Sequence, residues 1–96
     1  MPIESSQGQQ AKGWYVYIIL ASDKSLYTGI TTDVERRFAE HGSTTKGARF
    51  FRGRAPLEVV HTERYPDRSS ASQREAEIKK LSRKSKLSLI GKKLPA

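Results

Sequence analysis

The sequence predicts a single α+β domain, in which a three-stranded antiparallel sheet is flanked by helices in the order ββαβαα. Two observations lead to this fold class. Segments rich in aromatic and β-branched residues occur as a closely spaced pair, and capped amphipathic segments follow them. A chain of 96 residues has room for one hydrophobic core. The apolar residues make up 35% of the chain and are clustered, which favours a compact domain over general disorder.

The strands are predicted from residue type. Residues 14–20 and Leu26–Thr31 are rich in aromatic and β-branched side chains. The polar stretch 21–25 between them is short enough to close a hairpin. A loop over 42–56, which contains three glycines, precedes a third strand over 57–65.

The first helix is predicted over Val34–His41. Asp33 stands in front of it and is a good N-cap, because its carboxylate accepts from the free N–H groups of the first turn. Gly42 follows the last residue and is a good C-terminal stop. The pattern therefore places a short helix directly after the hairpin.

Two further helices follow the third strand. Ser69 or Ser70 is expected to cap the first of them, which runs to about Leu81. The second covers Arg83–Ile90 and is stopped by Gly91. These helices complete the predicted ββαβαα order.

The domain is expected to span residues 13–91, between a flexible tail over 1–12 and a basic tail over 92–96. The longest apolar run, 16–21, is far shorter than the roughly 20 residues of a membrane span. The chain has no cysteine, which excludes disulfides, Cys-based metal sites and Cys nucleophiles. We therefore expect a cytoplasmic protein with no membrane partner.

The charge points to a polyanionic partner. Eighteen Lys and Arg residues against ten Asp and Glu residues give a net charge of +8, and nucleic acid is the commonest partner of such a small basic chain. The excess lies in two blocks without carboxylates, 46–54 and 83–93, which either bind phosphate or stay solvated. The candidate phosphate contacts are Lys46, Arg49, Arg52, Arg54, Lys84 and Lys86.

Helical geometry sorts the polar residues of the first helix. Val34, Phe38 and His41 share one face. Arg37 lies at the edge of that face, whereas Arg36 points the opposite way. Arg37 is thus the arginine that leans against the sheet, either as a functional group or as a core-edge residue with its charge in solvent.

The helix after the third strand has a carboxylate on its predicted buried face, which is unusual for a charged group. Glu75 lies between Ala71 and Ile78 on that face, whereas Glu77 lies outside it. A carboxylate in such a place is costly unless it is paired or bound to metal. Two interpretations follow: a metal ligand, or a salt bridge, most plausibly to Arg37.

Three tyrosines crowd the hairpin. Tyr15 and Tyr17 are two residues apart and share one face of the sheet, as do Tyr27 and Gly29. Ordinary packing with satisfied hydroxyls is one interpretation. The other is a phosphodiester site, because a strand glycine often marks close approach by another group.

Together these motifs resemble the GIY-YIG endonuclease superfamily, and most closely its small stand-alone bacterial members of the YhbQ type. Tyr15-Val16-Tyr17 is similar to the first half-motif and Tyr27-Thr28-Gly29 to the second. Residues 27–41 resemble the signature that carries the arginine and histidine, and residues 71–81 resemble the helix that carries a metal-binding glutamate. The resemblance extends over residues 14–90.

The resemblance implies a GIY-YIG nuclease-like domain and a metal-dependent endonuclease. By it, Glu75 holds Mg²⁺ or Mn²⁺, and Arg37 stabilises the charge of the transition state. Tyr17, Tyr27 or His41 orients or deprotonates the attacking water, with Tyr17 expected nearer the nucleophile. Gly29 belongs to the nucleic-acid-binding set. The expected partner is nucleic acid, DNA ahead of RNA, selected by structure and not by sequence, with a repair complex as a further partner.

Two departures from the family keep other functions open. Tyr15 stands where the first half-motif has a glycine. The chain also contains no asparagine, whereas many members have one after the metal glutamate. One alternative is a module that binds nucleic acid without cutting it. Another is an interaction protein that docks on ribosomal RNA or a repair assembly.

Overall fold

The computed structural model describes residues 13–43 and 45–91, so both predicted tails lie outside the described residues. Within the described part, the order of strands and helices is the predicted ββαβαα, with one 3₁₀ turn added. The elements are β2 (Trp14–Ala21), β3 (Leu26–Thr31), α1 (Val34–His41), η1 (Arg49–Phe51), β4 (Pro56–Tyr65), α2 (Arg68–Lys79) and α3 (Arg83–Ile90).

The three strands form one antiparallel sheet in the order β3-β2-β4. The central strand β2 pairs with β3 as the predicted hairpin, with Tyr17 opposite Gly29. It pairs with β4 on its other side, and this ladder shifts register after Ile18 and again after Leu20. The most buried strand is therefore β2, and β3 is an edge strand.

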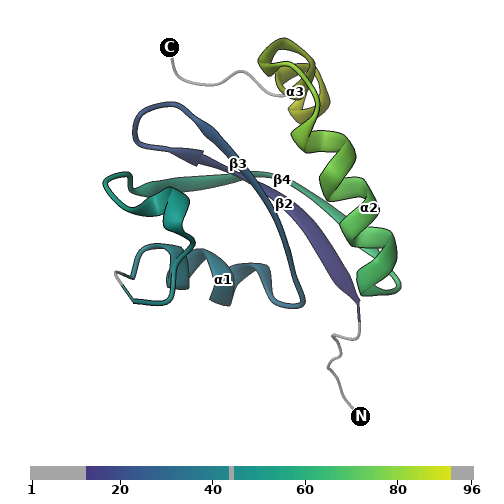
Figure 1. Ribbon diagram of the computed structural model, residues 1–96, viewed down its shortest axis with the longest axis horizontal. Coiled ribbons are helices and arrows are strands. Elements are labelled where there is room, and N and C mark those ends of the chain that lie inside the picture. Colours follow the sequence, from purple (N-terminus) through teal and green to yellow (C-terminus); the bar gives the residue numbers. More distant parts are fainter. Residues whose placement is uncertain (1–12, 44, 92–96) are drawn as a thin grey trace.

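The helices cover the sheet on two sides (Figure 1). Alternate residues of β2 point to opposite faces, so the strand contributes to two separate cores. Val16 and Ile18 pack with Ala71 and Ile78 of α2, together with Ile90 of α3. We call this side of the sheet the α2 face.

The opposite side of the sheet, which we call the α1 face, has a more aromatic core. Tyr17 and Ile19 pack there with Phe51, and Val34 and Phe38 of α1 lie against them. The two sides thus differ in composition, because the buried residues Val16, Ile18 and Leu20 of β2 are aliphatic, whereas Tyr17 contributes an aromatic ring to the other side.

The helix ends follow from their caps. The Asp33 carboxylate accepts from the N–H of Arg36 at the start of α1, and Ser82 caps α3 through the N–H of Ser85. Gly91 ends α3 in the left-handed region, at a φ of 68°, which glycine adopts without strain. Both helices have the predicted bounds.

The predicted ends of α2 were wrong by a few residues. Asp67 caps the helix by accepting from the N–H of Ser70, whereas Ser69 and Ser70 were expected to do so. The helix ends at Lys79 and not at Leu81, because the last N–H groups turn to tighter bonds such as Lys80 N–H to the Glu77 carbonyl. Over the residues that the structure describes, no helix is long and apolar enough to cross a membrane.

Candidate functional site

Tyr17 and Gly29 form the floor of the candidate site. Tyr17 stands on β2 directly opposite Gly29 on β3, and its side chain is 1% exposed. A Cβ atom added to Gly29 would lie 2.6 Å from the Tyr17 hydroxyl and 3.1 Å from the Tyr27 ring. The glycine therefore makes room for the two tyrosines, and it lies buried beneath them instead of offering an open surface to a ligand.

His41 joins the last turn of α1 to Tyr17. Its Nε2 lies 2.8 Å from the Tyr17 hydroxyl, and its Nδ1 accepts from the backbone N–H of Ala48 at 3.1 Å. A neutral imidazole carries one proton, and an Nδ1 that accepts cannot be the nitrogen that holds it. Nε2 therefore carries the proton and donates to the Tyr17 oxygen, which leaves the phenolic proton of Tyr17 free to donate elsewhere.

Burial keeps both partners uncharged at neutral pH. It lowers the pKa of His41 from 6.5 to about 4, and the positive charge of Arg37 acts in the same direction. It also raises the pKa of Tyr17, an effect that Tyr27 strengthens and Arg37 opposes. The pair is thus a neutral imidazole hydrogen-bonded to a neutral phenol.

Tyr27 completes an aromatic cluster on the α1 face. Its ring centroid lies 5.1 Å from those of His41, Phe50 and Phe51, and 6.2 Å from that of Tyr17. The ring is half-buried, and no hydrogen bond to a residue in the described part of the chain holds its hydroxyl. The Tyr27 hydroxyl is therefore available to a ligand.

Arg37 is held beside the tyrosines, as the helical wheel predicts. One terminal nitrogen, Nη1, donates to Glu40 Oε1 at 2.9 Å and to the carbonyl of Lys46 at 2.8 Å. The Arg37 side chain is 29% exposed, against 61% for Arg36. Both of these bonds use one nitrogen, and the guanidinium also lies close enough to the Tyr17 hydroxyl for each group to affect the pKa of the other.

Glu75 comes from a different helix than His41 and Arg37. It belongs to α2, on the opposite face of the sheet, and its Oε2 pairs with Lys79 Nζ at 3.2 Å. The expected alternative, a salt bridge to Arg37, was wrong, because Arg37 pairs with Glu40 instead. Glu75 still belongs to the electrostatic surroundings of Tyr17, whose pKa its charge helps to raise after the larger effects of burial and Tyr27.

The surroundings of Glu75 do not form a closed metal site among the described residues. Among the described residues, no group of three or more His, Asp or Glu side chains gathers that could hold a metal. A closed zinc or calcium site needs more protein ligands than that. Mg²⁺, in contrast, keeps most of its waters and is commonly bound by one or two carboxylates together with substrate phosphates. Glu75, whose partner Lys79 is 53% exposed, is compatible with such a role.

The cations of the loop after α1 are not equivalent. Arg54 donates to Asp23 Oδ2 at 2.7 Å and to the Phe50 carbonyl, so it ties the loop to the β2–β3 turn. Arg52, Arg49 and Lys46 are exposed. Among the predicted phosphate contacts of this loop, Arg54 is therefore the cation whose side chain is bonded within the described part of the protein.

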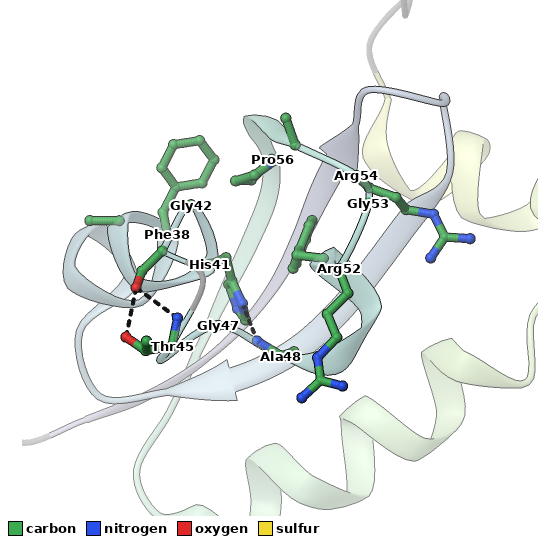
Figure 2. A pocket seen from close by; sticks show the side chains of 14 residues that line it. Phe38, His41, Gly42, Thr45, Gly47, Ala48, Arg52, Gly53, Arg54 and Pro56 are labelled. Carbon is green, nitrogen blue, oxygen red and sulfur yellow. Dashed lines mark hydrogen bonds between the residues drawn. The ribbon is translucent and has the colours of Figure 1, made fainter.

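The same loop and the end of α1 enclose a pocket of about 900 Å³ (Figure 2). Phe38, Phe51 and Pro56 contribute apolar surface, and Arg52 and Arg54 are the charged residues of its lining. Figure 2 shows His41 hydrogen-bonded to Ala48 in the wall of this pocket. The buried histidine thus separates the pocket from Tyr17.

The second basic block lies elsewhere. Lys84 and Lys86 belong to α3, which packs on the α2 face, whereas the loop over 45–54 lies on the α1 side. The predicted nucleic-acid-binding residues are therefore divided between two sides of the sheet.

The sequence reasoning missed a polar network on β4. Glu63 accepts from Arg74 through both carboxylate oxygens, at 2.9 and 3.2 Å, and also contacts His61 Nε2 and the Tyr65 hydroxyl. Although burial opposes it, these partners lower the pKa of Glu63 to about 2. The signal was present in the sequence, because 61, 63 and 65 alternate along one strand and so share a face.

The network lies next to the candidate metal ligand. Arg74 immediately precedes Glu75 on α2, and it also donates to Glu77 at 3.1 Å. The bidentate bond to Glu63 fixes the rotation of α2 against β4. Glu77 is 67% exposed and pairs with Arg74 at the surface, outside the buried face as the helical wheel predicts.

Comparison with known proteins agrees with this arrangement. The family model described as the GIY-YIG catalytic domain matches residues 13–88. A UPF0213 protein from Natronomonas pharaonis is 55% identical over 76 residues, which cover 79% of this chain and 88% of that protein.

Two solved structures are similar along most of their length. The UPF0213 protein from Bacillus halodurans is 44% identical with a TM-score of 0.53, covering 82% of this chain and 83% of that one. A protein from E. faecalis is 43% identical with a TM-score of 0.59, covering 83% and 84%. With a family model that matches most of its length, this chain belongs to the GIY-YIG catalytic domain family, and its relatives include UPF0213 proteins.

Proposed function

We propose that the protein is a metal-dependent endonuclease that hydrolyses phosphodiester bonds of DNA and selects its substrate by structure. The observation that carries the proposal is the buried Tyr17–His41 pair beside the guanidinium of Arg37. A neutral phenol with a free proton next to an arginine fork suits a phosphate oxygen that gains negative charge. Membership in a nuclease family supports the same chemistry.

Arg37 is proposed to stabilise the pentacoordinate phosphate. Its fork is oriented by Glu40 and the Lys46 carbonyl before any substrate arrives, so little side-chain freedom is lost on binding. Donors that are already in place where charge develops are typically worth a factor of about 10² to 10³ in rate.

Tyr27 is proposed to receive the attacking water. His41 is a poor general base, because Ala48 occupies its Nδ1 and its Nε2 already carries the proton that it donates to Tyr17. Burial raises the pKa of Tyr17, which suits this phenol to donating a hydrogen bond instead of removing a proton. Tyr27 then remains as the hydroxyl of the cluster with no partner in the described part of the chain.

Glu75 would hold the metal ion, Mg²⁺ or Mn²⁺. A divalent ion bound there would neutralise charge on the phosphate and on the leaving oxygen. The exposed Lys79 can release the carboxylate at small cost, because surface ion pairs are worth about 0 to 1 kcal/mol.

Substitution of Glu75 tests the proposal. Glu75→Gln keeps the shape of the side chain but removes the charge, and it should abolish Mg²⁺-dependent cleavage of nicked or branched DNA. Glu77→Gln is the matched control, since both glutamates belong to α2 and each pairs with a basic neighbour. Equal cleavage by the two variants would contradict the role of Glu75, and no cleavage by the unmodified protein with either metal on any DNA structure would contradict an endonuclease.

The second candidate is a binding module that grips nucleic acid without cutting it. The net charge of +8 and the lack of asparagine favour it. In that case Arg37→Ala would lower the affinity for DNA only slightly, and the affinity would still fall steeply with salt. An affinity that does not change with salt would exclude both candidates.

A further inference from the structure

Three consecutive residues, Lys46, Gly47 and Ala48, touch two members of the candidate site through their backbone. The Lys46 carbonyl accepts from Arg37 Nη1 at 2.8 Å, and the Ala48 N–H donates to His41 Nδ1 at 3.1 Å. Neither bond uses a side chain of this segment, which we call the loop clamp. The clamp therefore depends on how closely its backbone approaches α1.

Gly47, at the centre of the clamp, allows this close approach. A Cβ atom at Gly47 would lie 2.8 Å from both the Glu40 carbonyl oxygen and His41 Cα, and 3.0 Å from the His41 oxygen. These atoms belong to the backbone of the last helical turn and cannot rotate away as the end of a side chain can. Any larger residue would therefore push the clamp off the helix.

The other two glycines of the loop have different surroundings. A Cβ at Gly42 would come no nearer than 3.4 Å to any atom outside its own neighbours, and Gly42 has an ordinary helical φ of −78°. Gly53 has a φ of 83° and open space around it. Close backbone packing on α1 therefore distinguishes Gly47 from both.

We propose that Gly47 is a positioning residue for the nuclease reaction: the clamp that it permits orients Arg37 and fixes the proton of His41 on Nε2. With Nδ1 occupied by the Ala48 N–H, His41 can act only as a donor to Tyr17. Without the clamp, Nδ1 can take the proton and the His41–Tyr17 bond reverses. Tyr17 would then donate to His41, and its proton would no longer be available to the substrate.

Nuclear magnetic resonance of the His41 ring tests this inference directly. In the unmodified protein, the ¹⁵N shifts should identify the neutral ring as the tautomer with its proton on Nε2. The Ala48 amide should shift as His41 titrates, because protonation of Nδ1 breaks their bond. Burial and the charge of Arg37 lower the pKa of His41, whereas the charge of Glu40 raises it. A ring with its proton on Nδ1 in the unmodified protein would overturn the proposal.

Gly47→Ala and Gly42→Ala then form a matched pair. Gly47→Ala should give a mixture of tautomers, a higher midpoint for the titration of His41, and at least a tenfold lower kcat with nearly unchanged affinity for DNA. Gly42→Ala should match the unmodified protein in all of these measurements. A folded Gly47→Ala protein with unaltered ring shifts would refute the proposal.

The inference rests on the proposed nuclease function, but the two fail in different ways. If the unmodified protein cuts no DNA, the proposed function fails while the ring measurements still decide whether the clamp sets the tautomer. If Gly47→Ala does not fold, the unmodified protein still provides a test. Its ring tautomer and the shift of its Ala48 amide show whether the bond from Ala48 keeps the His41 proton on Nε2.

Discussion

The two faces of the sheet hold their functional groups in opposite ways. On the α1 face, Tyr17, His41 and Arg37 are fixed by contacts between different elements: β2 meets α1 through Tyr17 and His41, and the loop after α1 supplies a carbonyl and an N–H. On the α2 face, the one ion pair of Glu75 within residues 13–43 and 45–91 is with Lys79, one turn away on the same helix. The α1 face is thus built to hold one geometry, whereas the carboxylate on the α2 face is free to change partner.

This difference suits two kinds of interaction. Stabilising charge in a transition state requires donors that are in place beforehand, because reorganisation during the reaction costs rate. Binding a hydrated cation requires a carboxylate that can exchange one positive neighbour for another. The rigid part of the α2 face is the network around Glu63, which fixes the helix and leaves Glu75 unrestrained.

The largest effect is expected from breaking the fixed geometry at Arg37. Arg37→Lys keeps the charge but loses the planar fork, so cleavage should fall by about 10² to 10³. Arg36→Lys, one residue away and pointing to solvent, should change cleavage little. The rates on one branched DNA substrate provide the comparison, and equal losses would contradict the role proposed for the fixed fork of Arg37.

Stability should respond most to the network that anchors α2. Glu63→Gln removes a charge that accepts from Arg74, His61 and Tyr65, and should lower the free energy of unfolding by about 2 kcal/mol. Glu77→Gln breaks only an exposed ion pair on the same helix and should cost less than about 0.5 kcal/mol. Urea titrations measure both, and a loss for Glu77→Gln as large as that for Glu63→Gln would contradict the proposed anchor.

Acid should weaken the two faces in different ranges of pH. The pKa of His41 is lower in the folded protein, so unfolding gains a proton and stability falls as the pH drops from 6.5 to about 4. The pKa of Glu63 is also lowered, and its contribution is lost between pH 4.5 and about 2. His41→Phe should remove the loss of stability in the upper range and leave the lower one. Urea titrations at several pH values measure this. If His41→Phe loses as much stability as the unmodified protein between pH 6.5 and 4.5, the prediction is wrong.

The smallest effect is expected from the loop cations. Arg52→Ala should weaken DNA binding severalfold and reduce the salt slope by about one, as for a single lost phosphate contact. Arg54→Ala removes the bonds to Asp23 and Phe50 and should act mainly on stability. Binding measured at several salt concentrations separates the two, and similar salt slopes for both variants would show that both arginines contact phosphate.

The sequence predicted the elements better than the contacts between them. The bounds of α1 and α3 followed from Asp33, Gly42 and Gly91, because a cap is a local interaction. The 3₁₀ turn over Arg49–Phe51 was missed, since the aromatic cluster that buries Phe51 brings together residues distant in sequence. Packing between residues far apart in the sequence cannot be predicted from local sequence patterns.

The same limit applies to the site. The choice of Arg37 over Arg36 followed from helical periodicity alone. The partner of Glu75 was predicted wrongly, because the helical wheel does not show that α1 and α2 lie on opposite sides of the sheet. Gly47 could not be separated from Gly42 and Gly53 in the sequence, since the distinction depends on a backbone contact with α1.

The loop after α1 is attached at both ends, by Gly47 against the helix and by Arg54 against Asp23 of the β2–β3 turn. A segment with two fixed ends has a fixed span, so a change in its length would displace one of the two attachments. Among relatives, insertions and deletions should therefore be rare between these two residues and commoner before Gly47. A peptide tag or a fused label should therefore be tolerated before Gly47. An insertion between Gly47 and Arg54 should disturb the contacts of the loop with Arg37 and His41.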